Sequence, residues 1–355
     1  MAGMTSHERF TRMFQHREAD RVAMWDFPWP GTLRRWRNEG MPADASYEDY
    51  FDVDKVSRVV VDNSPRYPEH TIEENEEFKV ITTSWGGTQR DFKDQDSTPE
   101  FIGYTIVDWD TWTAAKARMT PTPERIPWDH LKTNYEKWRK EGHWILGDLW
   151  FSFNQLTSYV VGMERFLMYL IEEPELCKDM LLYSLDVNLK LLEMAWDAGY
   201  TFDMLNIRDD MGYKHAQFFS LKTYREIIRP SHQKAVDWAH NRGIKTRLHS
   251  CGYIMPLLPE IVDVGFDALH PMEVKAGMNP QEVKSRYGDR LVLHGGFNAV
   301  LWKDRDAITA EMERLLPVLK QSSGYVFAAD HSIPNDVSLE NMSTIIALAK
   351  KLGSF

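Results

Sequence analysis

Short apolar runs alternate with longer amphipathic segments along most of the chain. Runs rich in β-branched and aromatic residues predict strands, and apolar residues spaced three and four positions apart predict helices. The predicted strands are Val22–Asp26, Val56–Asp62, His143–Trp150, Phe202–Arg208, Ile244–His249, Phe266–His270, Arg290–His294 and Gly324–Ala329. The predicted helices are Glu164–Ile171, Pro174–Ala198, Leu221–Asn241, Asn279–Tyr287 and Ala307–Gln321. Strands that alternate with helices favour right-handed βαβ units and a parallel sheet.

Eight strands in 355 residues favour a closed (β/α)8 TIM barrel over an open sheet. No linker or internal repeat divides the sequence, so we expect a single domain over residues 1–355. Polar and β-prone residues alternate around Trp85, Gly86 and Gly87, which predicts a β-hairpin inserted at about residues 66–93, near the N-terminal third. A helix-containing excursion is expected over Arg34–Asp49.

The composition narrows the class of protein. With 42 Lys and Arg against 53 Asp and Glu, the net charge is −11, which argues against a nucleic-acid-binding surface. No run of about 18 apolar residues predicts a membrane span. Only two cysteines occur, Cys177 and Cys251, which favours a reducing compartment over a disulfide framework. We therefore expect a cytoplasmic protein that binds neither nucleic acid nor membrane, for which a homodimer is one candidate assembly.

The chain is unusually rich in tryptophan, with 13 residues of this type. Two interpretations stay open. The indole rings could fill a large core, or they could line a wide pocket for a flat or bulky ligand.

Polar residues follow nearly every predicted strand. In a parallel barrel the carboxyl ends of the strands meet at one mouth, where reactive side chains gather. The residues at or just past these ends are Asp26, Asp148, Asp209, Asp210, His249, Cys251, His270, Glu273, His294, Asn298, Asp330 and His331. Asp and Asn are also common at turns, so part of this pattern could reflect chain reversal alone.

His249 and Cys251 form the sharpest motif. In extended backbone, residues two positions apart project to the same side, so an imidazole and a thiolate could share one zinc ion. Gly252 would let the chain turn directly afterwards. A third ligand must come from elsewhere, with His331 and Glu273 as the candidates. The alternative is a buried cysteine beside a hydrogen-bonded histidine, and His331 could instead contact substrate.

Two acidic residues are candidates for acid–base chemistry. Asp210 ends one strand and Asp26 lies in the aromatic, proline-rich segment Trp25–Gly31, and each could orient or protonate a substrate or simply cap a turn. The residues expected to contact substrate are Trp25, Phe27, Trp29, Trp150 and Asn298.

At these residues the sequence resembles the uroporphyrinogen decarboxylase superfamily, which implies a (β/α)8 barrel. The resemblance lies in five segments that occur in the same order: Ser6–Arg21, His249–Ile254, Asp267–Gly277, Tyr287–Gly296 and Asp330–Asn341. The superfamily includes decarboxylases that need no metal or cofactor and hold porphyrinogen carboxylates with an arginine-rich N-terminal turn. The segment Trp25–Gly31 has no arginine. The resemblance therefore favours the other branch, the corrinoid-linked methyltransferases.

That branch binds zinc through a His-x-Cys pair and a later cysteine. His249 and Cys251 match the pair, whereas His331 takes the place of the later cysteine. The resemblance thus implies a zinc set of His249, Cys251 and His331, with Glu273 as a substitute or fourth ligand.

The expected function is a zinc-dependent methyltransferase or demethylase. It would move a methyl group between a small substrate, such as a methoxyarene, and a corrinoid protein or another acceptor. Two alternatives remain: a metal-free decarboxylase of a carboxylated ring, and a non-catalytic protein that binds a corrinoid or porphyrin.

Overall fold

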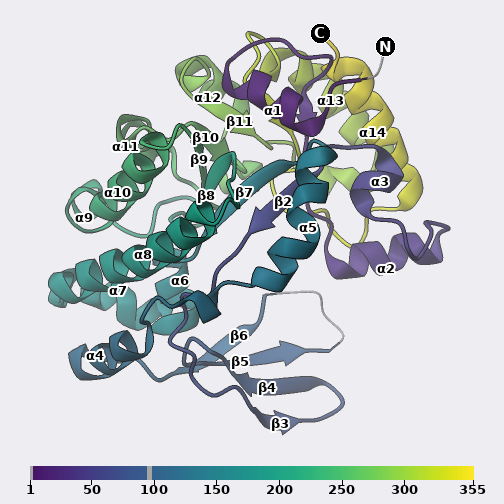
Figure 1. Cartoon of the computed structure of the whole chain (residues 1–355). Coiled ribbons are helices and arrows are strands. Elements are labelled where there is room, and N and C mark those ends of the chain that lie inside the picture. Colours follow the sequence, from purple (N-terminus) through teal and green to yellow (C-terminus); the bar gives the residue numbers. More distant parts are fainter. Residues whose placement is uncertain (1–2, 94–97) are drawn as a thin grey trace.

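Eight parallel strands form the centre of the molecule in a computed structural model, which describes residues 3–93 and 98–355 (Figure 1). These strands run in the spatial order β1-β12-β11-β10-β9-β8-β7-β2. Each coincides with a predicted strand, which confirms the expected (β/α)8 barrel. The barrel strands are β1 (Ala23–Met24), β2 (Val56–Val59), β7 (Trp144–Leu149), β8 (Met204–Arg208), β9 (Lys245–His249), β10 (Ala268–His270), β11 (Val292–His294) and β12 (Tyr325–Phe327).

The first and last strands of this order meet at a seam built around Asp54. Its backbone N–H donates to the carbonyl of Met24 at 3.1 Å, which links β1 to the start of β2. The buried Asp54 carboxylate accepts hydrogen bonds of 2.8 Å from the Met24 N–H and from Arg21, and it also pairs with Arg9. A single side chain thus ties the N-terminal helix to both edge strands.

Helices surround the barrel on its outer face (Figure 1). They include all five predicted helical segments, and α2 and α3 account for the excursion expected over Arg34–Asp49. The α-helices are α1 (Ser6–Phe14), α2 (Pro30–Asn38), α3 (Tyr47–Phe51), α4 (Trp109–Arg118), α5 (Trp128–Lys140), α6 (Phe153–Gln155), α7 (Met163–Glu172), α8 (Pro174–Asp197), α9 (Leu221–Thr223), α10 (Arg229–His240), α11 (Leu258–Val264), α12 (Pro280–Tyr287), α13 (Arg305–Leu319) and α14 (Leu339–Gly353). Within the described residues, no helix combines the length and the apolar character that a membrane crossing requires.

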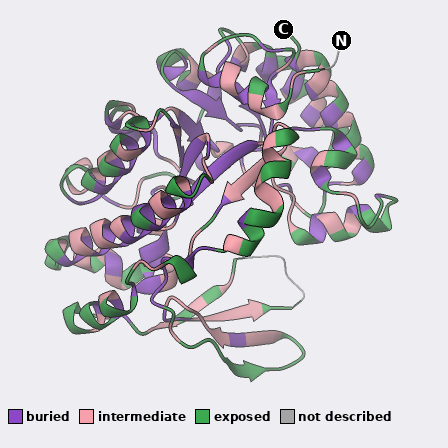
Figure 2. Cartoon of the chain, in the orientation of Figure 1, coloured by how far each residue is buried: buried purple, intermediate pink, exposed green. Residues whose placement is uncertain are grey.

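The barrel has a core inside as well as outside. The α1 side chains Phe10 and Phe14 stack against Trp144 with ring centroids 5.4 and 5.5 Å apart. This inner cluster lies at the beginnings of the barrel strands, most of which are buried along their length, with β2 as an exception (Figure 2). The amino-terminal end of the barrel is therefore plugged by apolar side chains, and only the opposite end is left for a site.

The predicted hairpin is present but belongs to a larger unit. It consists of β4 (Phe78–Thr82) and β5 (Gly87–Phe92), which pair antiparallel around a turn that contains Trp85 and Gly86. The strands β3 (Thr71–Glu74) and β6 (Glu100–Tyr104) pair with its two edges and complete a four-stranded antiparallel sheet. This sheet projects from the barrel and is more exposed than the barrel (Figures 1 and 2).

Candidate active site

A cavity of about 400 Å³ lies at the carboxyl end of the barrel. Side chains from the ends of five barrel strands line it: Arg58 of β2, Leu149 of β7, Arg208 of β8, His249 of β9 and His270 of β10. Tyr159, another lining residue, packs against Phe101 of β6 with ring centroids 4.9 Å apart, so the four-stranded sheet borders the same opening. The cavity therefore occupies the position where barrel enzymes place their chemistry.

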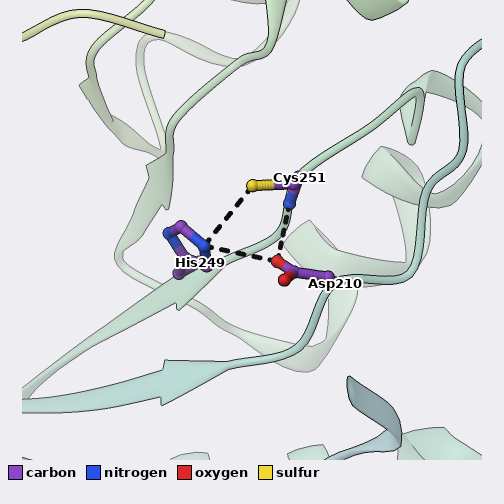
Figure 3. Close-up of side chains that lie close together, drawn as sticks. All are labelled: Asp210, His249 and Cys251. Atoms are coloured by element: carbon purple, nitrogen blue, oxygen red, sulfur yellow. Dashed lines mark hydrogen bonds and ion pairs between the residues drawn. The ribbon is translucent and has the colours of Figure 1, made fainter. Parts of the chain in front are cut away.

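Three potential metal ligands converge on the wall of this cavity. Donor atoms of Asp210, His249 and Cys251 all lie within 4.8 Å of one another (Figure 3). The Nε2 atom of His249 is 3.6 Å from the Cys251 sulfur and 3.3 Å from Oδ1 of Asp210. Tetrahedral zinc, with a Zn–S bond of about 2.3 Å and Zn–N and Zn–O bonds of about 2.0 Å, needs ligand separations of this size. The two separations measured from His249 Nε2 therefore suit a tetrahedral zinc ion.

A close approach of two glycines brings Asp210 to this pair. Gly252 has a φ of +78°, and a Cβ built on it would lie 2.2 Å from the carbonyl carbon of Gly212. Only glycine fits such a turn, as the sequence predicted. The contact presses the loop after β8 against the loop after β9, so that the Cys251 N–H donates to Oδ1 of Asp210 at 2.9 Å.

The surroundings of the cysteine favour a bound cation. Burial, together with the charges of Asp210 and Glu273, raises the pKa of the Cys251 thiol well above its ordinary value. Burial would also raise the pKa of Asp210, but its interactions with His249 and the Cys251 N–H hold it below the usual range. A divalent cation would neutralise the negative charge of the Asp210 carboxylate and stabilise the Cys251 thiolate. It would therefore lower the pKa of the thiol. The electrostatics thus fit a metal as well as the distances do.

A second histidine orients the first. The Nδ1 atoms of His249 and His270 are 2.6 Å apart. A metal on Nε2 of His249 requires the proton on Nδ1, which then donates to His270. Burial, with the nearby charges of His294 and Arg247, lowers the pKa of His270 well below its ordinary value, so its ring is neutral and can accept this bond. His270 is a positioning residue for the ligand His249.

Replacing His270 by phenylalanine is expected to weaken zinc binding by about tenfold to hundredfold, because His249 loses the acceptor that fixes its tautomer. His270→Gln, which keeps an acceptor, should retain more of the affinity. Competition of each variant with a chromogenic zinc chelator gives the dissociation constants. If the wild type and the phenylalanine variant bind zinc with equal affinity, His270 does not position the ligand His249.

Asp26 provides a group that titrates near neutrality. Its buried carboxylate lines the cavity and accepts hydrogen bonds of 2.7 Å from the N–H groups of Phe27 and Ala329. Burial, with a smaller contribution from the charge of Asp330, raises the pKa of Asp26 to about 7, against the opposite effect of these two hydrogen bonds. A carboxyl group with this pKa can both give and take a proton at neutral pH.

Comparison with known proteins agrees with this arrangement. A family model described as uroporphyrinogen decarboxylase (URO-D) matches residues 152–352, which is more than half of the chain. The chain belongs to the URO-D family. The solved structure of a methyltransferase from Methanosarcina mazei matches with a TM-score of 0.63 at 14% sequence identity, covering 98% of this chain and 99% of that chain. At that identity the similarity shows a common fold. No curated protein matches the sequence significantly.

Two predicted ligands of this URO-D protein lie outside the group of three. His331 lines the cavity, where its ring stacks on Trp29 at 6.2 Å. The carboxylate of Glu273 accepts a 2.7 Å hydrogen bond from the Gly252 N–H and lies 3.4 Å from the Lys275 amine. Glu273 therefore holds the turn that carries Cys251. Asp210 was expected to act as an acid or base. In the structure it lies beside His249 and Cys251, in the position of a third metal ligand.

Some aromatic residues line the cavity and others fill the core, so each interpretation of the tryptophan content holds for part of them. Phe27, Trp29 and Trp150 line the cavity, as expected of substrate contacts. Trp25 instead lies buried inside the barrel, where it stacks on His294 at 5.0 Å, and Asn298 caps a short helix through the N–H of Val300. Other tryptophans, among them Trp36, Trp112 and Trp302, fill the core.

The polar residues of the cavity that were not predicted from the sequence include Arg58, Gln155, Arg208 and Arg247. One signal for Arg247 was available, because it precedes His249 and Cys251 at a spacing of two and so shares their side of the strand. Arg208 ends the predicted strand Phe202–Arg208, and Arg58 lies inside the predicted strand Val56–Asp62, whereas the candidates at strand ends were acidic, histidine, cysteine and asparagine residues. Nothing in the local sequence distinguishes Gln155.

Proposed function

We propose that this protein is a zinc-dependent methyltransferase that moves a methyl group between a small substrate, such as a methoxyarene, and a corrinoid carried by a partner protein. The convergence of Asp210, His249 and Cys251 at the cavity carries the proposal. Three protein ligands leave one position of a tetrahedral zinc ion open to substrate, which is typical of catalytic rather than structural zinc sites. The shared fold with a methyltransferase from Methanosarcina mazei supports this choice within the URO-D family.

The other residues of the cavity would bind the substrate or transfer a proton. Phe27, Trp29 and Trp150 would hold a flat ring by stacking. Asp26, with its pKa of about 7, would carry the proton at the heteroatom that loses or gains the methyl group. When bound, zinc would polarise that heteroatom or hold it as an anion. His331 lines the same cavity and would contact substrate or supply a further ligand.

The reaction can be followed with free cob(I)alamin as methyl acceptor and 4-methoxybenzoate as donor. The O–CH3 bond breaks with its electron pair left on oxygen, which takes a proton, and the cobalt supplies the pair for the new Co–C bond. We expect methylcobalamin and 4-hydroxybenzoate to form with one zinc ion per chain present, and expect chelation to stop the reaction and added zinc to restore it.

The two cysteines offer a matched pair of variants. Cys251→Ser should lose both zinc and methyl transfer, whereas Cys177→Ala should keep both, because Cys177 is buried in α8. Full activity in zinc-free wild-type protein would overturn the proposal. Release of carbon dioxide that survives chelation would identify a decarboxylase, and tight pigment binding without turnover would identify a carrier.

A further inference from the structure

Positive charge gathers on the wall of the cavity that also carries Phe27 and Trp150. Arg58, Arg208 and Arg247 come from three different strands, and all line the cavity. In the described part of the chain the carboxylate that contacts Arg58 and Arg208 is that of Asp148, at 3.3 and 3.1 Å from the same oxygen. Arg247 is held by the neutral groups Asn206 and His294.

The two carboxylates that line the cavity, Asp26 and Asp210, are engaged elsewhere. Asp26 accepts from two backbone N–H groups, and Asp210 belongs to the group of His249 and Cys251. Arg58 and Arg208 therefore share the single carboxylate of Asp148, and Arg247 contacts no carboxylate among the described residues. The pKa of Arg247 falls well below its ordinary value because of burial and the like charges of Arg58 and Arg208. Burial and the charge of Arg208 likewise lower the pKa of Arg58, despite the opposing effect of Asp148.

The geometry of these arginines leaves their edges available. The Arg58 guanidinium lies over the ring of Phe27, at 5.1 Å from its centroid, and that of Arg208 lies over Trp150 at 5.4 Å. Stacking occupies the flat faces of a guanidinium, while its N–H groups point outward in the plane and match the two oxygens of a carboxylate. Each of these two arginines contributes a single nitrogen to its contact with Asp148.

Gln155 adds an independent observation. The residue is 2% exposed and lines the same cavity, yet neither its amide oxygen nor its amide nitrogen has a hydrogen-bond partner among residues 3–93 and 98–355. Buried polar atoms are rarely left unpaired, because an unpaired atom has lost its hydrogen bonds to water without gaining others. An amide in this state points to a polar group of a ligand that completes the site.

We infer that the substrate of this site is an aromatic carboxylic acid whose carboxylate lies against Arg58 and Arg208. This inference rests on the proposed function and adds the chemical class of its substrate. Arg208 is the register partner of His249 in the adjacent strand, so the anion-binding end of the cavity lies beside the candidate metal ligands. The two arginines would thus hold the carboxylate of the acid, while its methyl-bearing heteroatom reaches the candidate zinc site.

Calorimetric titration of the zinc-loaded protein with 4-methoxybenzoate and with the neutral 4-methoxybenzyl alcohol tests the inference without turnover. We expect the acid to bind more tightly than the alcohol by at least about tenfold, as charge-assisted hydrogen bonds imply. Arg208→Gln should weaken binding of the acid by about tenfold to hundredfold and leave the alcohol unaffected. Arg208→Lys, which keeps the charge, should recover part of the loss.

The control is Arg286→Gln, because Arg286 lies on the exposed face of α12 and pairs with Glu282 one helical turn away. It should leave both titrations unchanged. Equal binding of acid and alcohol, no binding of either, or an Arg208→Gln variant that binds the acid normally would each overturn the inference. Zinc content and methyl transfer are measured separately: if they hold while the acid shows no preference, only the inference fails. If the acid binds through Arg208 but zinc is absent, the proposed methyl transfer fails instead.

Discussion

Replacing Asp54 by asparagine is expected to lower the free energy of unfolding by about 3–5 kcal/mol, because the change removes the buried negative charge that compensates Arg9 and Arg21. The carboxylate pairs with Arg9 and Arg21 and accepts from the Met24 N–H at the seam between β1 and β2. An amide offers one acceptor oxygen in place of two, and in either orientation its NH2 group would face the guanidinium of Arg9 or that of Arg21. Urea titration followed by circular dichroism gives the change in stability.

Asp20→Asn provides the matched comparison, because Asp20 also contacts Arg9 through two hydrogen bonds of 2.8 Å. The Asp20 side chain is 37% exposed, whereas that of Asp54 is fully buried. Water can replace much of what is lost at an exposed pair, so we expect a loss of about 1 kcal/mol or less. If both variants lost a similar amount of unfolding free energy, the burial of Asp54 would not determine how much this residue contributes to stability.

The sequence was a good guide to the barrel because its signal is repeated. Eight separate runs, from β1 to β12, each carry the β-branched and apolar character of a strand buried on both faces. An error at one run would leave the alternation of strands and helices intact. The four-stranded sheet was harder to predict, since β3 is exposed at every position and offers little apolar pattern.

The helices α4 and α5 were not predicted for a related reason. Much of α4 is polar or exposed, with Trp112 and Ala115 as its buried residues, and Leu131 is the buried residue of α5. A helix that buries so few side chains lacks the three- and four-residue spacing on which the prediction relied.

The pairing of His249 with Cys251 could be predicted from their spacing in the sequence, but the position of Asp210 beside them could not. His249 and Cys251 lie two residues apart on one strand, and this spacing alone predicts that their side chains point the same way. Asp210 reaches them only because Gly212 and Gly252 allow two loops to approach closely, and the sequence does not record which loops touch. The same holds for Arg58 and Arg208, which share Asp148 although 150 residues separate them.

Zinc affinity in the wild type is expected to rise by roughly tenfold per pH unit between about pH 7 and 8, because zinc binding must displace the thiol proton of Cys251. The pKa of this thiol is raised well above its ordinary value, so the proton is present throughout this range in the metal-free protein and absent from the thiolate that binds zinc. The sign follows directly: a higher pH favours the form that has lost the proton.

Calorimetry in two buffers with different ionisation enthalpies would count the protons released on zinc binding, and we expect about one to come from the thiol. Cys251→Ser should bind zinc at least about a hundredfold more weakly, because a hydroxyl replaces the thiolate ligand, and should lose the pH dependence. Cys177→Ala should keep both the affinity and its slope, since Cys177 lies buried in α8 and outside the group of three. A wild-type affinity that is independent of pH would mean that Cys251 does not bind the metal as a thiolate, and the site would then depend on Asp210 and His249.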